Sequence, residues 1–567
     1  MRRTLESVAA RTHSATAIRA RPVAVDTQPE LMKRELPAGR TGRKVFLFGV
    51  ASAVLVFAVG ITLNVFRVGL APDIHVDELI YTNAAQNLAS GNGLSVQGQP
   101  FFWQPPLFFL LEWPVAMVLG LGHANTFDAV LQLRVLNGVL AAGTATLMFL
   151  LGWRVRGLWT GWLMAIFFVV DPFVLHLSRR LYIEPLPGFL IAAAILAMNV
   201  SMGRWTLRRR LFVGLLLGLA ILSKELAAFA LLVPVLMWAR RAFSWKEPLT
   251  MAGTAVGVYT FYPLGAFLSG HITAFVDVKR FQFDHLRGLV HFSTFSRPGA
   301  ALTQTLSASA GDYWPAYTLI ALAIPAVLWL LLRRDRASQL LGCWALVTYA
   351  FIGILRAFSD VEDQFFYYLM LPVCAVSGFV LAELIGRLWL RYRPPAGSPR
   401  ASTGRRKLIA LAPLIAFTLF IVINDARLWD LRYVTGVDNG FSNLVASIAR
   451  VVPPGSVIDS PGGSSEELKF AYPNGQYKFI QVRTPRALRN LHIQWYVLRS
   501  KDIGLPGGFG IDRRYYAYLT SRAVQIWSVS EHTYYDFGLW LVDDPSVLHD
   551  VDFPVAPPPR GAQPGTS

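Results

Sequence analysis

Apolar residues are gathered into eleven blocks, separated by short polar segments, over the first three quarters of the chain. Most blocks have about 17–25 residues, and an α-helix needs about 20 to cross the roughly 30 Å of hydrocarbon in a bilayer. The pattern therefore predicts an all-α polytopic membrane protein with about eleven transmembrane helices. The blocks occupy residues 46–69, 134–153, 158–176, 183–202, 211–222, 226–239, 249–268, 316–332, 338–355, 366–386 and 408–424.

The blocks at 211–222 and 226–239 are short, and Ser223, Lys224 and Glu225 stand between them. One long helix over both blocks would reverse the orientation of every later helix. Two short helices instead keep all the basic connecting segments on one side of the membrane. We therefore expect two helices here.

Beyond residue 424 the pattern changes. Short β-rich runs at 456–459, 477–482, 493–498, 523–529 and 538–542 alternate with helical patterns at 441–450 and 513–521. This alternation predicts a small α/β domain over residues 425–555. The Pro/Gly-rich residues 556–567 are typical of a disordered tail.

Charge fixes the expected orientation. The chain has 53 Lys or Arg against 35 Asp or Glu, a formal net charge of +18, which at first suggests nucleic-acid binding. However, the chain is 54% hydrophobic, and its basic residues gather between alternate apolar blocks, whereas residues 68–133 contain none. By the positive-inside rule the basic segments face the cytoplasm, so we expect no nucleic-acid partner. They carry Arg154 and Arg156, then Arg204, Arg208, Arg209 and Arg210, then Arg240, Arg241 and Lys246, then Arg333, Arg334 and Arg336, and finally the basic residues of 387–407.

This orientation predicts a multi-pass plasma-membrane protein with a cytoplasmic N-terminus and an extracytoplasmic C-terminal domain. The basic residues 1–45, rich in Ser, Thr, Ala and Pro, are expected to form a disordered cytoplasmic tail, followed by an uncleaved first span. Residues 46–424 then form the transmembrane domain, whose first outer loop is 70–133. Cys343 and Cys374 both fall within apolar blocks, which argues against a disulfide framework.

Ionisable groups on the predicted outer side are the candidates for chemistry, because charges at membrane depth are costly. Acids lie in the first outer loop and cations in later ones. Such a set fits a site where a carboxylate activates a hydroxyl while cations hold a phosphate. The groups are Asp77, Glu78, Arg179, Arg180, Glu184, Lys224, Glu225, Lys279, Arg280, His285, Arg287, Arg356, Asp360, Glu362 and Asp363.

The first-loop acids are adjacent, so they are not equivalent if the stretch is helical. Residues four apart share a helix face, whereas neighbours differ by roughly 100°. We expect Asp77 and Tyr81 to face one cavity, with Asp77 as a base and Glu78 as support. For the later groups, purely structural roles remain open as alternatives. Glu184 could pair with Arg180 one turn away, or Lys224 could extend its ammonium group from a helix end.

Several segments, in order along residues 46–390, resemble the GT-C glycosyltransferases of the protein O-mannosyltransferase and aminoarabinose-transferase kinds. The C-terminal domain lies outside this resemblance, and Gln104 stands where such proteins often carry His or Lys. The matching segments are Asp77-Glu78-x-x-Tyr81, Gly98-Gln-Pro100, Gln104-Pro-Pro-Leu107, Ser178-Arg179-Arg180-Leu-Tyr-Ile-Glu184, the Gly214-to-Glu225 segment and Asp363-Gln-Phe-Phe-Tyr367-Tyr368.

The resemblance implies transfer of a hexosyl or pentosyl group from a polyprenyl-phosphate carrier to a hydroxyl on the outer face, with inversion. The acceptor would be a glycan, lipid or protein. It implies no resident cofactor, and it leaves open whether a divalent cation is bound. The implied roles are Asp77 as general base with Glu78 and Glu184, then Arg179, Arg180 and Lys224 on the donor phosphate, and Tyr81, Gln104, Tyr367 and Asp363 as acceptor or supporting residues.

Two other classes of function remain as alternatives. A flippase or other transporter of lipid-linked glycans would favour charges at span centres and an internal repeat, and the sequence shows neither. A non-catalytic cell-envelope assembly factor would place the function in the C-terminal domain.

Overall fold

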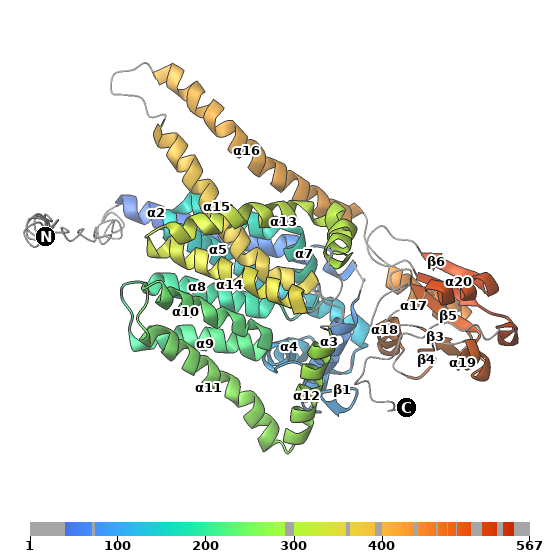
Figure 1. The fold of residues 1–567 in the computed structure, drawn as a ribbon. Coiled ribbons are helices and arrows are strands. Elements are labelled where there is room, and N and C mark those ends of the chain that lie inside the picture. Colours follow the sequence, from blue (N-terminus) through green and yellow to red (C-terminus); the bar gives the residue numbers. More distant parts are fainter. Residues whose placement is uncertain are drawn as a thin grey trace, which may run out of the picture. The chain divides into compact units, whose positions relative to one another are not determined.

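A computed structural model describes residues 40–70, 74–289, 300–358, 363–391, 400–435, 440–460, 463–472, 474–482, 485–499, 513–529 and 537–548 (Figure 1). The predicted tails lie outside this part, apart from the first helical residues at 40–45. The chain divides into two compact units, Met1–Ser52 and Ala53–Ser567. The first contains the beginning of α2, and the second contains every later element.

All eleven apolar blocks form helices. Seven are long and apolar enough to cross a membrane, or eight if α6 and α7, bent by 60° at their junction, count as one span. The others are shorter than 18 residues. The prediction of a polytopic helical membrane protein is confirmed. The helices are α2 (Arg40–Val65), α5 (Thr126–Arg156), α6 (Leu158–Val170), α7 (Pro172–Ser178), α8 (Pro185–Ser201), α9 (Leu207–Ser223), the 3₁₀-helix η3 (Glu225–Leu231) with α10 (Leu232–Ala239), α11 (Lys246–Leu268), α13 (Ala300–Leu332), α14 (Arg336–Phe358), α15 (Phe366–Arg391) and α16 (Arg400–Asp430).

The chain reverses at Lys224. This residue has extended backbone angles, φ −152° and ψ 120°, between α9 and η3. Helices α9 and α11 run in the same direction, because Arg210 pairs with Glu247 and Gly218, two turns later, lies against Ala255 and Val258. The intervening η3–α10 must therefore run the opposite way. The prediction of two helices is confirmed.

The close approach of α9 to α11 depends on glycine. A Cβ atom built on Gly214 would lie 2.6 Å from the Thr254 Cβ and 2.7 Å from the Met251 carbonyl oxygen. We expect Gly214→Ala to lower the free energy of unfolding by about 1–3 kcal/mol through overpacking. The midpoint of thermal unfolding in detergent measures this. Gly253→Ala on α11 is the matched control, since its Cβ would meet nothing within 4 Å; equal midpoints for the two variants would contradict the packing.

The basic segments predicted on one side do meet at one end of the bundle. Glu383 on α15 forms ion pairs with Arg156 after α5, with Arg333 after α13 at 3.3 Å, and with Arg387 at 2.8 Å. The Arg240 guanidinium, at the end of α10, donates to the Leu331 carbonyl. Four separate predicted inner segments are thus brought together, as a multi-pass membrane protein requires.

The C-terminal region forms a five-stranded sheet with helices, which confirms the predicted α/β domain. The strand order is β4-β3-β5-β7-β6, with β3 parallel to β4 and β5, and β7 antiparallel to β5 and β6. Two hydrophobic clusters, around Ile458 and Tyr496, contain residues that alternate along β5. The strands are β3 (Val457–Asp459), β4 (Lys478–Ile480), β5 (Trp495–Arg499), β6 (Val524–Val529) and β7 (Phe537–Leu541), and the helices are α17 (Gly440–Val451), α18 (Gly463–Ala471), α19 (Pro485–Asn490) and α20 (Arg513–Arg522).

Between α2 and α5 the segment predicted to be the first outer loop is itself structured. It contains α3 (Val76–Ala89), a hairpin of β1 (Ser95–Val96) and β2 (Gln99–Pro100), and α4 (Leu107–Val118). The hairpin turn consists of Gln97 and Gly98, both with positive φ (49° and 78°), as the tightest hairpins require. A later helix, α12 (Ile272–Leu289), reaches this loop through Gln282, whose side chain donates to the Trp103 carbonyl.

Candidate active site

The helix that carries the two adjacent acids begins with a capping box. The His75 ring accepts a hydrogen bond from the Asp77 amide at 3.3 Å, and Glu78 accepts one from the His75 amide at 3.0 Å. These contacts satisfy amide groups that the first turn of α3 leaves without helical partners. They also fix Asp77 in that first turn.

Asp77 combines a partly exposed side chain with a raised pKa. Its side chain is 30% exposed, so a substrate can reach it. The surrounding protein still removes enough water to raise its pKa from 3.8 to about 6, against the opposing positive charge of Lys224. The charges of Glu184 and Glu78 raise it further.

Glu78 instead makes buried structural contacts with both of its carboxylate oxygens. It is fully buried and forms a bidentate ion pair with Arg134 of α5, at 2.8 and 2.9 Å. It also accepts from the Leu181 amide at 2.7 Å. Burial would raise the pKa of Glu78, but Arg134, the charge of Arg180 and the His75 amide together hold it below its usual value.

Arg134 was not among the residues singled out from the sequence. It is the first basic residue after the stretch 68–133 and opens an apolar block, so it resembles an ordinary flank of a membrane span. The signal that could have identified it is its position: a lone cation at the outer end of a helix, in a region whose acids have no other basic neighbour.

Glu184 and Lys224 form a second buried ion pair, between the residue before α8 and the break after α9. Glu184 is fully buried and Lys224 is 5% exposed. The Lys224 ammonium also lies 3.4 Å from the Gln364 side-chain oxygen and 5.1 Å from the centre of the Phe365 ring. Because both charges act on Asp77, these side chains and Asp77 form one group, here called the Asp77 cluster.

The neighbouring acid Glu225 points to a different set of partners. It accepts from the Tyr259 hydroxyl at 2.5 Å and forms an ion pair with Lys279 at 2.9 Å. Lys279 belongs to α12, so this contact holds α12 to the chain reversal at Lys224.

The two arginines predicted to bind phosphate separate from each other. Arg179 is buried, donates to the carbonyls of Leu63 and Phe66 at 2.6 and 2.8 Å, and covers the Tyr433 ring at 4.1 Å. Arg180 acts on Glu78 by its charge. Of the three predicted cations, Lys224 is the one in the Asp77 cluster.

The predicted supporting residues are spread over several places. Tyr81 is buried and packs its ring against Phe108 and Phe109, so it lines the core beneath α3. The Gln104 carbonyl accepts from the Tyr262 hydroxyl at 3.0 Å. Tyr367 is buried with its ring edge on Phe168. The side chains of Asp363, His285, Arg287 and Arg356, and residues Asp360 and Glu362, lie outside the described part.

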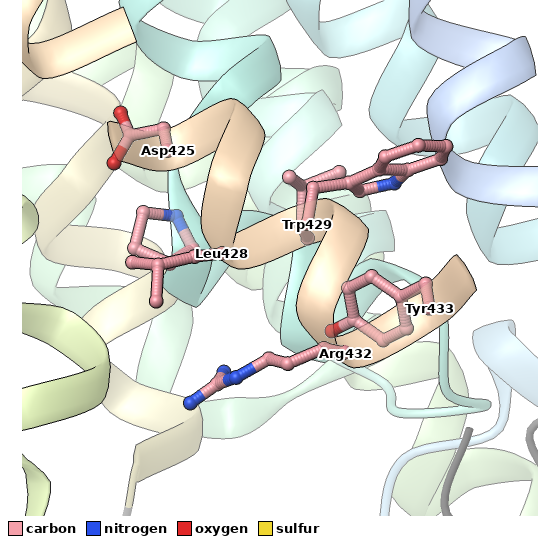
Figure 2. A pocket seen from close by; sticks show the side chains of 7 residues that line it. Asp425, Leu428, Trp429, Arg432 and Tyr433 are labelled. Carbon is pink, nitrogen blue, oxygen red and sulfur yellow. The ribbon is translucent and has the colours of Figure 1, made fainter. Parts of the chain in front are cut away.

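A separate small pocket lies between α7 and the end of α16 (Figure 2). Asp425 and Arg432 extend to different sides of it, with Trp429 between them in sequence and Tyr433 directly after Arg432. No member of the Asp77 cluster lines this pocket. The pocket therefore does not belong to the candidate active site.

Comparison with known proteins identifies the fold. No protein-family model matches the sequence, and no curated protein does so. An Archaeoglobus fulgidus oligosaccharyltransferase in complex with Zn and sulfate matches with a TM-score of 0.53 and 13% identity, over 86% of this chain and 72% of that chain. AglB from the same organism, in complex with an inhibitory peptide and a dolichol-phosphate, matches with a TM-score of 0.51 and 12% identity, over 79% and 69%.

ArnT from Cupriavidus metallidurans bound to undecaprenyl phosphate matches with a TM-score of 0.49 and 13% identity, over 88% of this chain and 98% of that chain. The fold assignment rests on the two Archaeoglobus structures. This chain has the GT-C fold, as its sequence motifs indicated.

Proposed function

We propose that this protein is a glycosyltransferase that transfers one sugar from a polyprenyl-phosphate carrier to an acceptor hydroxyl. The observation that carries the proposal is the Asp77 cluster, in which a partly exposed carboxylate of raised pKa lies in the electrostatic field of a buried ammonium group. The dolichol-phosphate bound by AglB, which has the same fold, supports a lipid-phosphate donor.

The proposed step is a single displacement. The acceptor hydroxyl oxygen attacks the anomeric carbon while its proton passes to Asp77. The bond between that carbon and the phosphate oxygen breaks, its electron pair stays on the phosphate, and the configuration at the anomeric carbon inverts. The products are the glycosylated acceptor and the polyprenyl phosphate.

One carboxylate suffices for this chemistry. A glycosidase needs a second carboxylic acid to protonate a poor leaving group. A phosphate leaves as an anion, and a nearby cation stabilises the charge that it gains. In this proposal Lys224 takes that role, with Arg180 as a second candidate and Glu78 supporting the helix that carries the base. A Zn-bound structure of the same fold makes a divalent cation the alternative for the same role.

The proposal includes an orientation. The basic segments around Glu383 would face the cytoplasm, and the Asp77 cluster and C-terminal domain would lie on the opposite, outer side. The donor would then enter from the outer leaflet. Alkylation of single cysteines introduced at Asn92 and at Arg334 by a membrane-impermeant reagent, in intact cells, would distinguish the two faces.

A transfer assay tests the function. Purified protein in lipid is given labelled polyprenyl-phosphate sugars together with an extract of cell-envelope acceptors. We expect label to move into acceptor material while free polyprenyl phosphate accumulates in equal amount. Movement of intact lipid-linked sugar across vesicles without cleavage of the sugar–phosphate bond would contradict the proposal and indicate a transporter.

The transfer rate should depend on pH through Asp77. Its folded-state pKa of about 6 lies above the usual 3.8, so the carboxylate is lost to protonation as pH falls through about 6. A protonated Asp77 cannot accept the hydroxyl proton. We therefore expect kcat/KM to be level from about pH 8 to 7 and to fall close to tenfold per pH unit below about 6. Because the pKa of Glu78 is lowered, Glu78 stays ionised through this range, and a profile flat down to pH 5 would exclude Asp77 as the base.

A further inference from the structure

The Asp77 cluster already contains a cation, the Lys224 ammonium, which is bound to the Glu184 carboxylate. A divalent ion in such a site needs several oxygen ligands that are free to coordinate it. Over the part of the chain that the structure describes, no three His, Cys, Asp or Glu side chains come together in a way that could hold a metal ion. With the Lys224 ammonium in place, the described residues therefore do not fit a bound divalent cation.

The contacts of the two other acids, Glu78 and Glu184, explain why a metal ion does not fit. Glu78 offers no free oxygen, because Arg134 binds both of its carboxylate oxygens and the amides of Leu181 and His75 add further hydrogen bonds. Glu184 has one oxygen occupied by the Lys224 ammonium. Its other oxygen, Oε2, is buried and accepts no hydrogen bond from the described residues.

From this arrangement we infer that the Lys224 ammonium, held by Glu184, is the cation of the active site and takes the place of a divalent metal ion. The role of the ammonium in the reaction rests on the proposed function. The claim that the ammonium, and not a metal ion, is the cation bound to Glu184 does not depend on that function. It assigns to Glu184 the role of positioning residue, acting through Lys224.

Three features hold the ammonium in place. Lys224 lies at the chain reversal, so its side chain starts from extended backbone and not from within a helix. Glu184 neutralises it on one side, and Gln364 and the Phe365 ring flank it. With Glu184 fully buried, displacing the ammonium would leave a buried carboxylate without its ion partner, which the protein strongly disfavours.

The consequence for the reaction is specific. When the sugar–phosphate bond breaks, one additional negative charge forms on the departing phosphate, and one ammonium group nearby can balance it. A divalent ion entering the same space would meet the ammonium as a like charge at short range. We therefore expect transfer to be insensitive to EDTA.

Metal binding itself provides a test that does not depend on turnover. The purified full-length protein is titrated with Mn²⁺, and bound ion is measured by electron paramagnetic resonance. We expect the wild type to bind no Mn²⁺ at this site. At Mn²⁺ concentrations where the wild type shows no bound ion, we expect Lys224→Gln to bind Mn²⁺, which corresponds to an affinity at least about tenfold higher, because the repelling charge is gone while Asp77 and Glu184 remain.

Lys224→Arg is the matched control, since it keeps the charge and should behave as wild type in the titration. Stoichiometric Mn²⁺ binding to wild type that Asp77→Asn or Glu184→Gln abolishes would overturn the inference. Failure of folded Lys224→Gln to gain binding would also overturn it, because the ammonium would then not be what excludes the ion. If no sugar transfer is found under any condition, the proposed function fails, while the titration still decides which cation occupies the site.

Discussion

Asp77→Asn should reduce the rate of sugar transfer by about 10²–10⁴-fold, the range in which a general base contributes to catalysis. Asparagine has nearly the same size and keeps the backbone amide that donates to the His75 cap, but it cannot accept the hydroxyl proton. The loss should appear in kcat with little change in KM for the donor, because the proton moves only in the transition state. Initial rates with labelled donor at pH 7.5 measure both parameters.

The control for this substitution is Asp128→Asn. Asp128 is also an acid in the first turn of a helix, α5, but it is exposed and lies outside the Asp77 cluster. It should keep wild-type activity. An Asp77→Asn protein with an unchanged unfolding midpoint and at least a third of wild-type kcat would rule out Asp77 as the base.

Arg134→Met should have the largest effect on stability. Methionine fills much of the volume of the arginine stem but leaves Glu78 buried without its ion partner. Breaking a buried pair in this way costs about 3–5 kcal/mol. Since Glu78 also binds the amides of His75 and Leu181, the start of α3 and the turn after α7 should loosen together. Thermal unfolding in detergent, followed by light scattering or intrinsic fluorescence, measures the loss.

Two further variants make this result interpretable. The double substitution Arg134→Met with Glu78→Gln removes both charges and should recover part of the loss. Arg154→Met, at the exposed other end of the same helix, should change the stability by less than about 0.5 kcal/mol. A cost below about 1 kcal/mol for Arg134→Met alone would show that the pair contributes little.

The main architecture could be predicted from the sequence because it depends on local patterns of apolar and charged residues. Apolar block lengths gave the helices, and basic segments showed which connections meet at one end, as the ion pairs around Glu383 confirm. The break at Lys224 was predictable because a charged tripeptide interrupts an apolar run. The five short strands of the C-terminal domain followed from their β-rich composition.

What the sequence did not indicate is which charges pair. Glu78 and Arg134 are 56 residues apart, and no local pattern connects them. Glu184 had a plausible partner one turn away in Arg180, yet its ion partner is Lys224, 40 residues further on. The carbonyl contacts that the Arg179 guanidinium makes at the end of α2 were not predictable from its neighbours in sequence either. Such choices depend on how the helices pack, which only the folded chain determines.

The chain reversal between α9 and η3 also limits how this part of the sequence can change in length. Lys224 and Glu225 are neighbours of opposite charge that serve different partners, Glu184 for the first and Lys279 with Tyr259 for the second. Deletion of Lys224 would bring the Glu225 carboxylate to the position of the ammonium, against the Glu184 carboxylate. Homologous chains should therefore tolerate insertions and deletions in many of their loops, but keep this reversal at constant length.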